Sequence, residues 1–187
     1  YEAEGEAAFY GPKLDIQTTN VYGKEDTLIT IQIDFELAKR FDMVYVDQDG
    51  KKKYPFIIHR TSMGCYERTL ALLIEKYAGA LPLWVMDEQV RVMSLSERTE
   101  SQVTEIAEIL RRAGIRVKTD TRSEKIGYKI REAQQFKIPY MLIIGDKEAE
   151  AGLVSVRKRK VGDLGQMSLD EFIAKIKSEI DSKDVEG

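Results

Sequence analysis

The sequence predicts two parts of different fold class, an α+β part followed by an α/β part. In the first part, strand candidates within residues 28–58 follow one another without helices, which favours an antiparallel sheet. In the second part, strands and helices alternate in the order β-α-β-α-β-β-α, which indicates a mixed sheet. Small residues, Gly and Pro at positions 78–82 separate the two patterns. We therefore expect domains at residues 1–82 and 86–187.

Composition narrows the protein class. The 187 residues are 43% hydrophobic and 33% charged, so the chain can bury a core and stay soluble. One cysteine excludes an intramolecular disulfide and fits a reducing compartment such as the cytoplasm. No apolar run approaches the roughly 20 residues that span a bilayer, so we expect no membrane partner. The chain starts with Tyr1 instead of Met, and we expect it to be a piece of a longer protein.

The elements of the first part follow from local patterns. Residues 28–35 are rich in β-branched side chains and predict a strand. Residues 43–54 predict a hairpin because Asp49-Gly50 supplies a tight turn, and residues 56–58 predict another strand. From Tyr66 to Tyr77, apolar residues recur at helical spacing and form one stripe.

The second part is equally patterned. Strands are predicted at residues 89–95, 115–118, 139–144 and 153–157, and helices at residues 98–113 and 124–136. Gly114 is placed to end the first helix in a left-handed conformation. Ser168 and Glu171 form a capping box that opens a final helix.

The segment that follows the strand at 56–58 contains two candidate ligand-binding residues, His59 and Arg68. His59, the only histidine, ends a β-prone run and could ligate a metal, or it could be a hydrogen-bonded structural histidine. Arg68, in the first turn of the next helix, suits phosphate or a stacked base, and the alternative is a surface ion pair. Glu67 could orient Arg68 or pair with a nearby lysine.

The first half offers further polar candidates. Phe9-Tyr10-Gly11-Pro12-Lys13 predicts a compact turn that exposes the Tyr10 phenol and the Lys13 ammonium. Gln32 lies in an otherwise apolar strand, so its amide needs a partner. That partner could be a ligand or neighbouring backbone.

The second half contains a basic segment. Residues 116–160 carry 12 basic and 6 acidic side chains, an excess that suits a phosphate-rich partner or a solvated surface. Within the helix at 124–136, Lys125, Lys129 and Glu132 share one face, while Ile126 and Ile130 share the neighbouring buried face. Tyr128 is available for base stacking.

Taken together, several strings resemble the threonyl-tRNA synthetases, a family of class II aminoacyl-tRNA synthetases. The similarity covers nearly the whole chain. The strings are Phe-Tyr-Gly-Pro-Lys at 9–13, Gln-Ile-Asp at 32–34, His59-Arg60 to Glu67-Arg68, Arg122 to Glu132, Lys-Ile-Pro-Tyr at 137–140 and Gly-Asp-Lys-Glu at 145–148.

The resemblance implies a fold and an active site for the first part. Residues 1–82 look like the C-terminal portion of the antiparallel class II catalytic domain. By this resemblance His59 matches a ligand of the catalytic zinc, and Arg68, with Glu67 beside it, matches the motif that contacts ATP and its Mg²⁺. Tyr10 and Gln32 match positions that face threonine or its adenylate, and Lys13 lies nearby.

The resemblance also implies a role for the second part. Residues 86–187 look like a mixed-sheet anticodon-binding domain that binds threonine tRNA. Glu148 and Arg157 match positions that read anticodon bases. The tRNA-facing basic helix is matched by Arg122, Lys125, Lys129 and Arg131. The full-length enzyme of this kind is expected to be a homodimer.

The chain also departs from the family pattern. The other zinc ligands, motif 1 and the motif 2 arginine are absent from this sequence, and Thr27 stands where many members carry glutamine. We therefore expect a C-terminal fragment that is inactive alone and leaves zinc unbound. Alternatives are a non-catalytic tRNA-binding module and another class II enzyme such as the prolyl synthetase.

Overall fold

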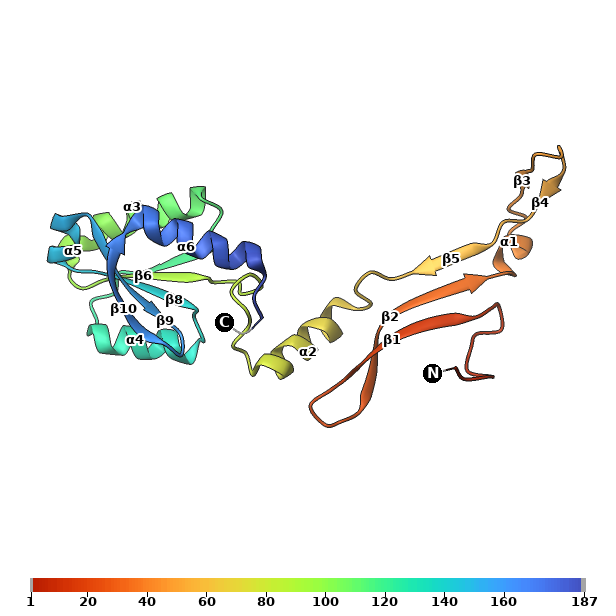
Figure 1. The fold of residues 1–187 in the computed structure, drawn as a ribbon, viewed down its shortest axis with the longest axis horizontal. Coiled ribbons are helices and arrows are strands. Elements are labelled where there is room, and N and C mark those ends of the chain that lie inside the picture. Colours follow the sequence, from red (N-terminus) through yellow and green to blue (C-terminus); the bar gives the residue numbers. More distant parts are fainter. Residues whose placement is uncertain (1, 186–187) are drawn as a thin grey trace. The chain divides into compact units, whose positions relative to one another are not determined.

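The computed structural model describes residues 2–185 and separates the chain into two compact units, Tyr1–Lys76 and Tyr77–Gly187 (Figure 1). Each unit has its own sheet or sheets. Among the described residues, no helix combines the length and apolar character needed to cross a membrane.

The first unit is built on a three-stranded antiparallel sheet in the order β1-β2-β5. The predicted strands are confirmed as β2 (Glu25–Asp34) and β5 (Ile57–Arg60). The edge strand β1 (Lys13–Thr19) was not predicted. Only Leu14 and Ile16 are apolar within it, so the alternation that marks a strand is weak.

A small hairpin and two helices complete the first unit. The predicted hairpin is confirmed as β3 (Tyr45–Val46) paired with β4 (Lys52–Lys53), and Gly50 has the positive φ of +74° that its turn requires. The four-residue helix α1 (Leu37–Arg40) was too short to predict. Helix α2 (Tyr66–Tyr77) has the predicted bounds, yet none of its residues is buried.

The second unit contains a five-stranded mixed sheet in the order β10-β9-β8-β6-β7. Its strands are β6 (Val90–Ser94), β7 (Val117–Asp120), β8 (Tyr140–Ile144), β9 (Leu153–Lys158) and β10 (Gly162–Ser168). Strand β6 lies between β7 and β8 and is parallel to both, whereas β9 and β10 continue the sheet antiparallel. The prediction of a mixed α/β sheet is confirmed.

Helices cover both faces of this sheet. Helices α3 (Glu100–Arg112) and α6 (Leu169–Ser182) lie on one face, and α4 (Ile126–Gln135) lies on the other (Figure 1). The larger core packs under α3 and α6 and includes Phe172, Val92 and Leu142, all fully buried. Met93 and Met141 belong to a smaller core under α4.

Helix ends match their sequence signals where those signals are strong. Gly114 has a φ of +84° after α3. The Ser168 hydroxyl accepts a hydrogen bond from the Glu171 amide, and the Glu171 carboxylate accepts one from the Ser168 amide, so the predicted capping box is present. Helix α5 (Asp146–Ala151) and strand β10 were missed because one is very short and the other contains two glycines.

The segment at residues 81–86 is fixed to the second unit by hydrogen bonds. The Arg116 guanidinium donates to the carbonyl oxygens of Trp84 and Met86, each at 2.9 Å. The Arg159 guanidinium donates to the carbonyl oxygen of Leu81 at 2.9 Å. Leu83 is buried in the larger core, so this segment is part of the unit and not a loose tether.

Candidate functional site

A row of polar side chains crosses the sheet of the first unit. Lys13 on β1 is paired directly with Gln32 on β2, which is paired in turn with His59 on β5. Directly paired residues of antiparallel strands project from the same face of a sheet. The register therefore brings three candidate residues from distant parts of the sequence onto one face.

Tyr10 joins this row through the turn before β1. Its hydroxyl donates to Oε1 of Gln32 at 2.8 Å, and its backbone oxygen accepts a hydrogen bond from the Phe35 amide at 2.9 Å. The partner of the Gln32 amide oxygen is thus a phenol and not backbone. Lys13 pairs with Asp15 at 2.8 Å, and this hydrogen bond, helped by the Thr30 hydroxyl, lowers the pKa of Asp15.

A buried carboxylate forms a hydrogen bond with the imidazole of His59. Its Nε2 lies 2.9 Å from Oδ2 of Asp34, a residue with no exposed area. Burial alone would raise the pKa of Asp34, but hydrogen bonds from the Leu37 amide, His59 and the Glu36 amide outweigh burial and lower that pKa. Asp34 is therefore a carboxylate near neutral pH and acts as an acceptor toward the imidazole.

The donor set around His59 fits one ligand of a metal site. An imidazole that is hydrogen-bonded to a carboxylate through one nitrogen is the usual arrangement of a zinc-ligating histidine. Within residues 2–185, no group of three His, Cys, Asp or Glu side chains is arranged to hold a metal ion. A zinc ion at His59 needs further ligands that the described residues do not supply.

Arg68 occupies a different end of the same sheet. Its Nη1 donates to the carbonyl oxygen of Thr27 at 3.1 Å, beside a cavity of about 130 Å³ that it helps to line. Thr27 and Gln32 are five residues apart on β2, which is ~17 Å along an extended strand. The structure thus places Arg68 apart from the row that contains Gln32.

The turn before α2 explains how Arg68 is presented. Gly64 has a φ of +67°, and a Cβ there would lie 2.2 Å from the carbonyl oxygen of Leu28, so only glycine fits. Glu67 does not orient Arg68: its carboxylate accepts a hydrogen bond from the Cys65 thiol at 2.8 Å, which lowers the pKa of Glu67.

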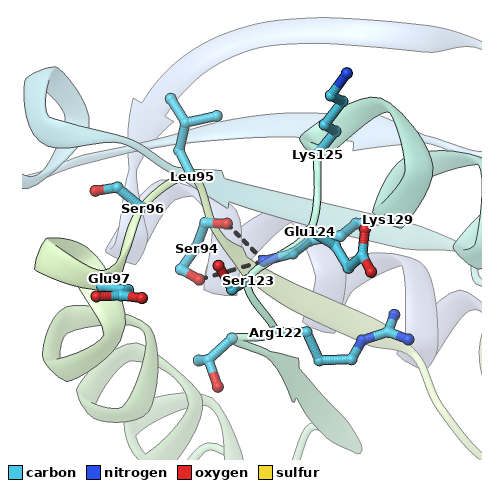
Figure 2. Close-up of a pocket in the computed structure, with 10 residues that line it drawn as sticks. Ser94, Leu95, Ser96, Glu97, Arg122, Ser123, Glu124, Lys125 and Lys129 are labelled. Carbon is cyan, nitrogen blue, oxygen red and sulfur yellow. Dashed lines mark hydrogen bonds between the residues drawn. The ribbon is translucent and has the colours of Figure 1, made fainter.

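The second unit has a pocket at the carboxyl ends of its parallel strands. Strand β6 has a parallel neighbour on each side. The chain leaves β6 toward α3 on one face and leaves β7 toward α4 on the other, so the two connections diverge at the carboxyl ends of these strands. Such a switch point is where open α/β sheets bind ligands. A pocket of about 290 Å³ lies there (Figure 2). It is lined by Ser94, Leu95, Ser96, Glu97, Thr121, Arg122, Ser123, Glu124, Lys125 and Lys129.

The prediction that Lys129 lies on an exposed, tRNA-facing surface is wrong. Only 1% of Lys129 is exposed, and its ammonium donates to the carbonyl oxygen of Ser94 at 2.9 Å (Figure 2). It also donates to the carbonyl oxygen of Asp120 at 3.2 Å. Helical spacing placed Lys129 with Lys125 and Glu132. The reason for burial is that polar atoms at the ends of β6 and β7 satisfy the ammonium, which spacing alone does not reveal.

Arg122 is held at the rim of the pocket by two carboxylates. Its guanidinium donates to both carboxylate oxygens of Asp120, at 2.9 and 2.7 Å, and also pairs with Glu132. These hydrogen bonds, the one to Asp120 first, raise the pKa of Arg122. Arg122 therefore fixes the loop after β7 to α4, and less of its hydrogen-bonding capacity is left for a ligand.

Two predicted cations remain accessible near α4. Lys125 caps the start of α4 with extended backbone and is exposed, as is Arg131. Tyr128 is 52% exposed on the same helix. The amino end of a helix carries partial positive charge, so it adds to the charge of Lys125 at the pocket.

Glu148 and Arg157 lie on a separate polar surface of the sheet. Ser155 and Arg157 project from β9 on the face that α4 covers over β6 and β8. Glu148 accepts hydrogen bonds from the Ser155 hydroxyl at 2.8 Å and from the Gln166 amide at 2.6 Å. Burial acts to raise the pKa of Glu148, but its hydrogen bonds, the one from Ser155 foremost, lower that pKa overall. Arg157 lies two residues from Ser155 on β9 and pairs with Asp163 at 3.4 Å.

Some residues of these sites were not singled out from the sequence. Asp34 was part of a family string, and its position after a β-prone run was the available signal. Ser94, Ser96 and Thr121 carry no motif, and only the sheet order brings them to one pocket.

Comparisons with known proteins agree with this two-part structure. Residues 2–77 match the family model described as the tRNA synthetase class II core domain (G, H, P, S and T), and residues 89–179 match the anticodon binding domain. The threonine–tRNA ligase of Clostridium perfringens strain 13 is 60% identical over 98% of this chain. The chain belongs to the threonyl-tRNA synthetase family.

Other relatives agree with this assignment. The threonine–tRNA ligase of Clostridium botulinum strain Eklund 17B is 56% identical over 98% of the chain. The RNA binding domain of threonyl-tRNA synthetase from Cryptosporidium parvum has a similar structure, with a TM-score of 0.84 and 37% identity. That match covers 94% of this chain and 44% of the Cryptosporidium parvum chain. This synthetase-family chain spans 28% of the length of each of the two clostridial ligases.

Proposed function

We propose that this chain is part of a threonine–tRNA ligase and supplies one side of its catalytic site together with its anticodon-binding domain. The observation that carries the proposal is the 60% identity to a threonine–tRNA ligase over almost the whole chain. The reaction joins threonine to its tRNA through threonyl-adenylate, and it consumes ATP, which gives AMP and pyrophosphate, with Mg²⁺ as the cofactor of ATP.

The polar face of the first unit supports a role in activating threonine. Tyr10, Gln32 and Lys13 offer hydrogen bonds and one cation on a single face beside His59. Zinc at His59, when bound, would hold the amino and hydroxyl groups of threonine and so reject valine, which lacks the hydroxyl. The planar guanidinium of Arg68 suits the phosphates or base of ATP.

The second unit supports a role in binding tRNA. The exposed Lys125 and Arg131 offer positive charge for phosphates. Phosphate contacts position the protein on the nucleic acid but carry no sequence information. Glu148 and Arg157 offer an acceptor and a donor on a neighbouring sheet face, and groups of this kind read base edges.

The test is amino-acid-dependent exchange of pyrophosphate into ATP by the full-length enzyme. We expect threonine to drive the exchange and proline and valine not to do so. Exchange driven by proline would favour the prolyl alternative and contradict the proposal. The homodimer and the cytoplasmic location of the full-length enzyme are part of this proposal, and gel filtration and cell fractionation test them.

A second candidate is a tRNA-binding module without catalysis. The observation that favours it is that, within the described residues, no group of three His, Cys, Asp or Glu side chains is placed to hold a metal ion. Under this alternative the full-length protein binds threonine tRNA but shows no pyrophosphate exchange with any amino acid.

A further inference from the structure

A buried carboxylate in the turn after β2 has each of its oxygens engaged. Oδ1 of Asp34 accepts hydrogen bonds from the amides of Glu36 and Leu37, both at 2.8 Å. Oδ2 faces the imidazole of His59 at 2.9 Å. Since the backbone amides fix one oxygen, the carboxylate cannot rotate freely, and the other oxygen is held toward the ring.

We propose that Asp34 is a positioning residue that holds His59 as the Nε2–H tautomer, which leaves Nδ1 as the nitrogen that binds a metal. A carboxylate can only accept hydrogen bonds, so Nε2 must donate. A neutral imidazole has one N–H, and Nδ1 therefore keeps its lone pair. Only the metal-binding part of this inference depends on the proposed function.

The surroundings of His59 support this orientation. The side chain is 41% exposed, so one edge of the ring is accessible while the other contacts Asp34. Within residues 2–185, Asp34 is the only hydrogen-bond partner of the ring, and Nδ1 has none. The Tyr10 ring lies 6.0 Å from the imidazole, centre to centre.

Nitrogen NMR of this chain tests the tautomer directly because His59 is its only histidine. At pH 8 we expect a protonated Nε2 and an unprotonated Nδ1. In Asp34→Asn, the amide oxygen still accepts from the Glu36 and Leu37 amides, so the amide NH₂ faces the ring as a donor. We then expect the proton to move to Nδ1.

The control is Glu36→Gln, which removes a carboxylate two residues away that pairs with Lys39 and not with His59. We expect this variant to keep the wild-type tautomer. In every sample, the chemical shifts of the backbone amides of position 36 and of Leu37 report whether the turn is formed, because both amides donate hydrogen bonds to the side chain at position 34. A protonated Nδ1 in the wild type, or an unchanged tautomer in Asp34→Asn, would overturn the inference.

Zinc affinity of the full-length enzyme tests the consequence. We expect Asp34→Asn to weaken zinc binding by roughly 10–100-fold, the usual effect of losing the hydrogen-bond partner of a ligand, while Glu36→Gln leaves it unchanged. Unchanged zinc affinity in Asp34→Asn would contradict the positioning role. A wild-type enzyme that binds no zinc would contradict the proposed zinc site and the choice of Nδ1 as its ligand, whereas the NMR result decides the tautomer independently.

Discussion

The ammonium of Lys129 lies 2.9 Å from the carbonyl oxygen of Ser94 and 3.2 Å from that of Asp120. These two residues are the last of the parallel strands β6 and β7. Lys129 on α4 therefore holds the ends of β6 and β7 together, and residues at and after these ends line the switch-point pocket.

The first prediction concerns this contact. Lys129→Met removes the donor and leaves two buried carbonyl oxygens unsatisfied, so we expect the free energy of unfolding to fall by about 2 kcal/mol. Chemical denaturation of the chain, followed by a probe in the second unit, measures the change. The control is Lys125→Met at the exposed start of the same helix, which should change stability by less than about 0.5 kcal/mol. Equal stability of the two variants would contradict the role of Lys129.

The second prediction concerns phosphate contacts. A variant that makes one phosphate contact fewer releases fewer counterions when it binds tRNA. Lys125→Ala and Arg131→Ala should therefore each reduce the slope of log affinity against log salt by about 1. Titration of threonine tRNA at several salt concentrations measures the slope. Lys177→Ala removes an exposed charge from α6, on the other side of the sheet, and should leave the slope unchanged.

The third prediction concerns base recognition by Glu148. Glu148→Gln replaces an acceptor-only group by one that also donates, so we expect a loss of about 1–3 kcal/mol in binding threonine tRNA. Binding of a tRNA with a changed anticodon should weaken much less. Equal losses for both RNAs would show that Glu148 only supports Ser155 and Gln166.

The fourth prediction concerns ATP. In the full-length enzyme, Arg68→Ala should lower threonine-dependent pyrophosphate exchange by about tenfold or more, because a guanidinium positioned for phosphate charge is lost. Lys52→Ala is the control, since it removes an exposed charge from strand β4 and should leave the rate unchanged. An unchanged rate in Arg68→Ala would exclude this arginine from the ATP site.

The fifth prediction concerns acid stability. Hydrogen bonding from Arg122 holds the pKa of Asp120 below its ordinary value of 3.8, so ionised Asp120 favours the folded state. This contribution is present above about pH 4 and is lost as the pH falls through the lowered pKa of the folded state. Asp120→Asn should therefore flatten the loss of stability below about pH 4, as measured by denaturation at stepped pH. Asp181→Asn, an exposed substitution on α6, should not flatten it.

The sequence was a good guide where one local pattern determined the structure. The stripe from Tyr66 to Tyr77 and the capping box at Ser168 each produced the expected element. Strand β10 was missed because two glycines and a bulge after Asp163 weaken its alternation. Short helices such as α5 lack enough turns for a periodic signal.

The sites were harder to predict than the elements. Lys125 and Lys129 look equivalent in the sequence, yet one is exposed and the other is buried by the ends of two distant strands. Asp34 and His59 are 25 residues apart, and only the pairing of β2 with β5 places the carboxylate behind the ring. Family resemblance proposed the residues, and the strand register determined their partners.

Anticodon-dependent binding is the most direct test of the proposal that this chain carries the tRNA-reading part of a threonine–tRNA ligase. The measurement is the dissociation constant of the 187-residue chain for threonine tRNA and for the same tRNA with its anticodon replaced. We predict at least about tenfold tighter binding of the unaltered tRNA, which corresponds to one lost base contact. Equal dissociation constants for the two RNAs would contradict this proposal.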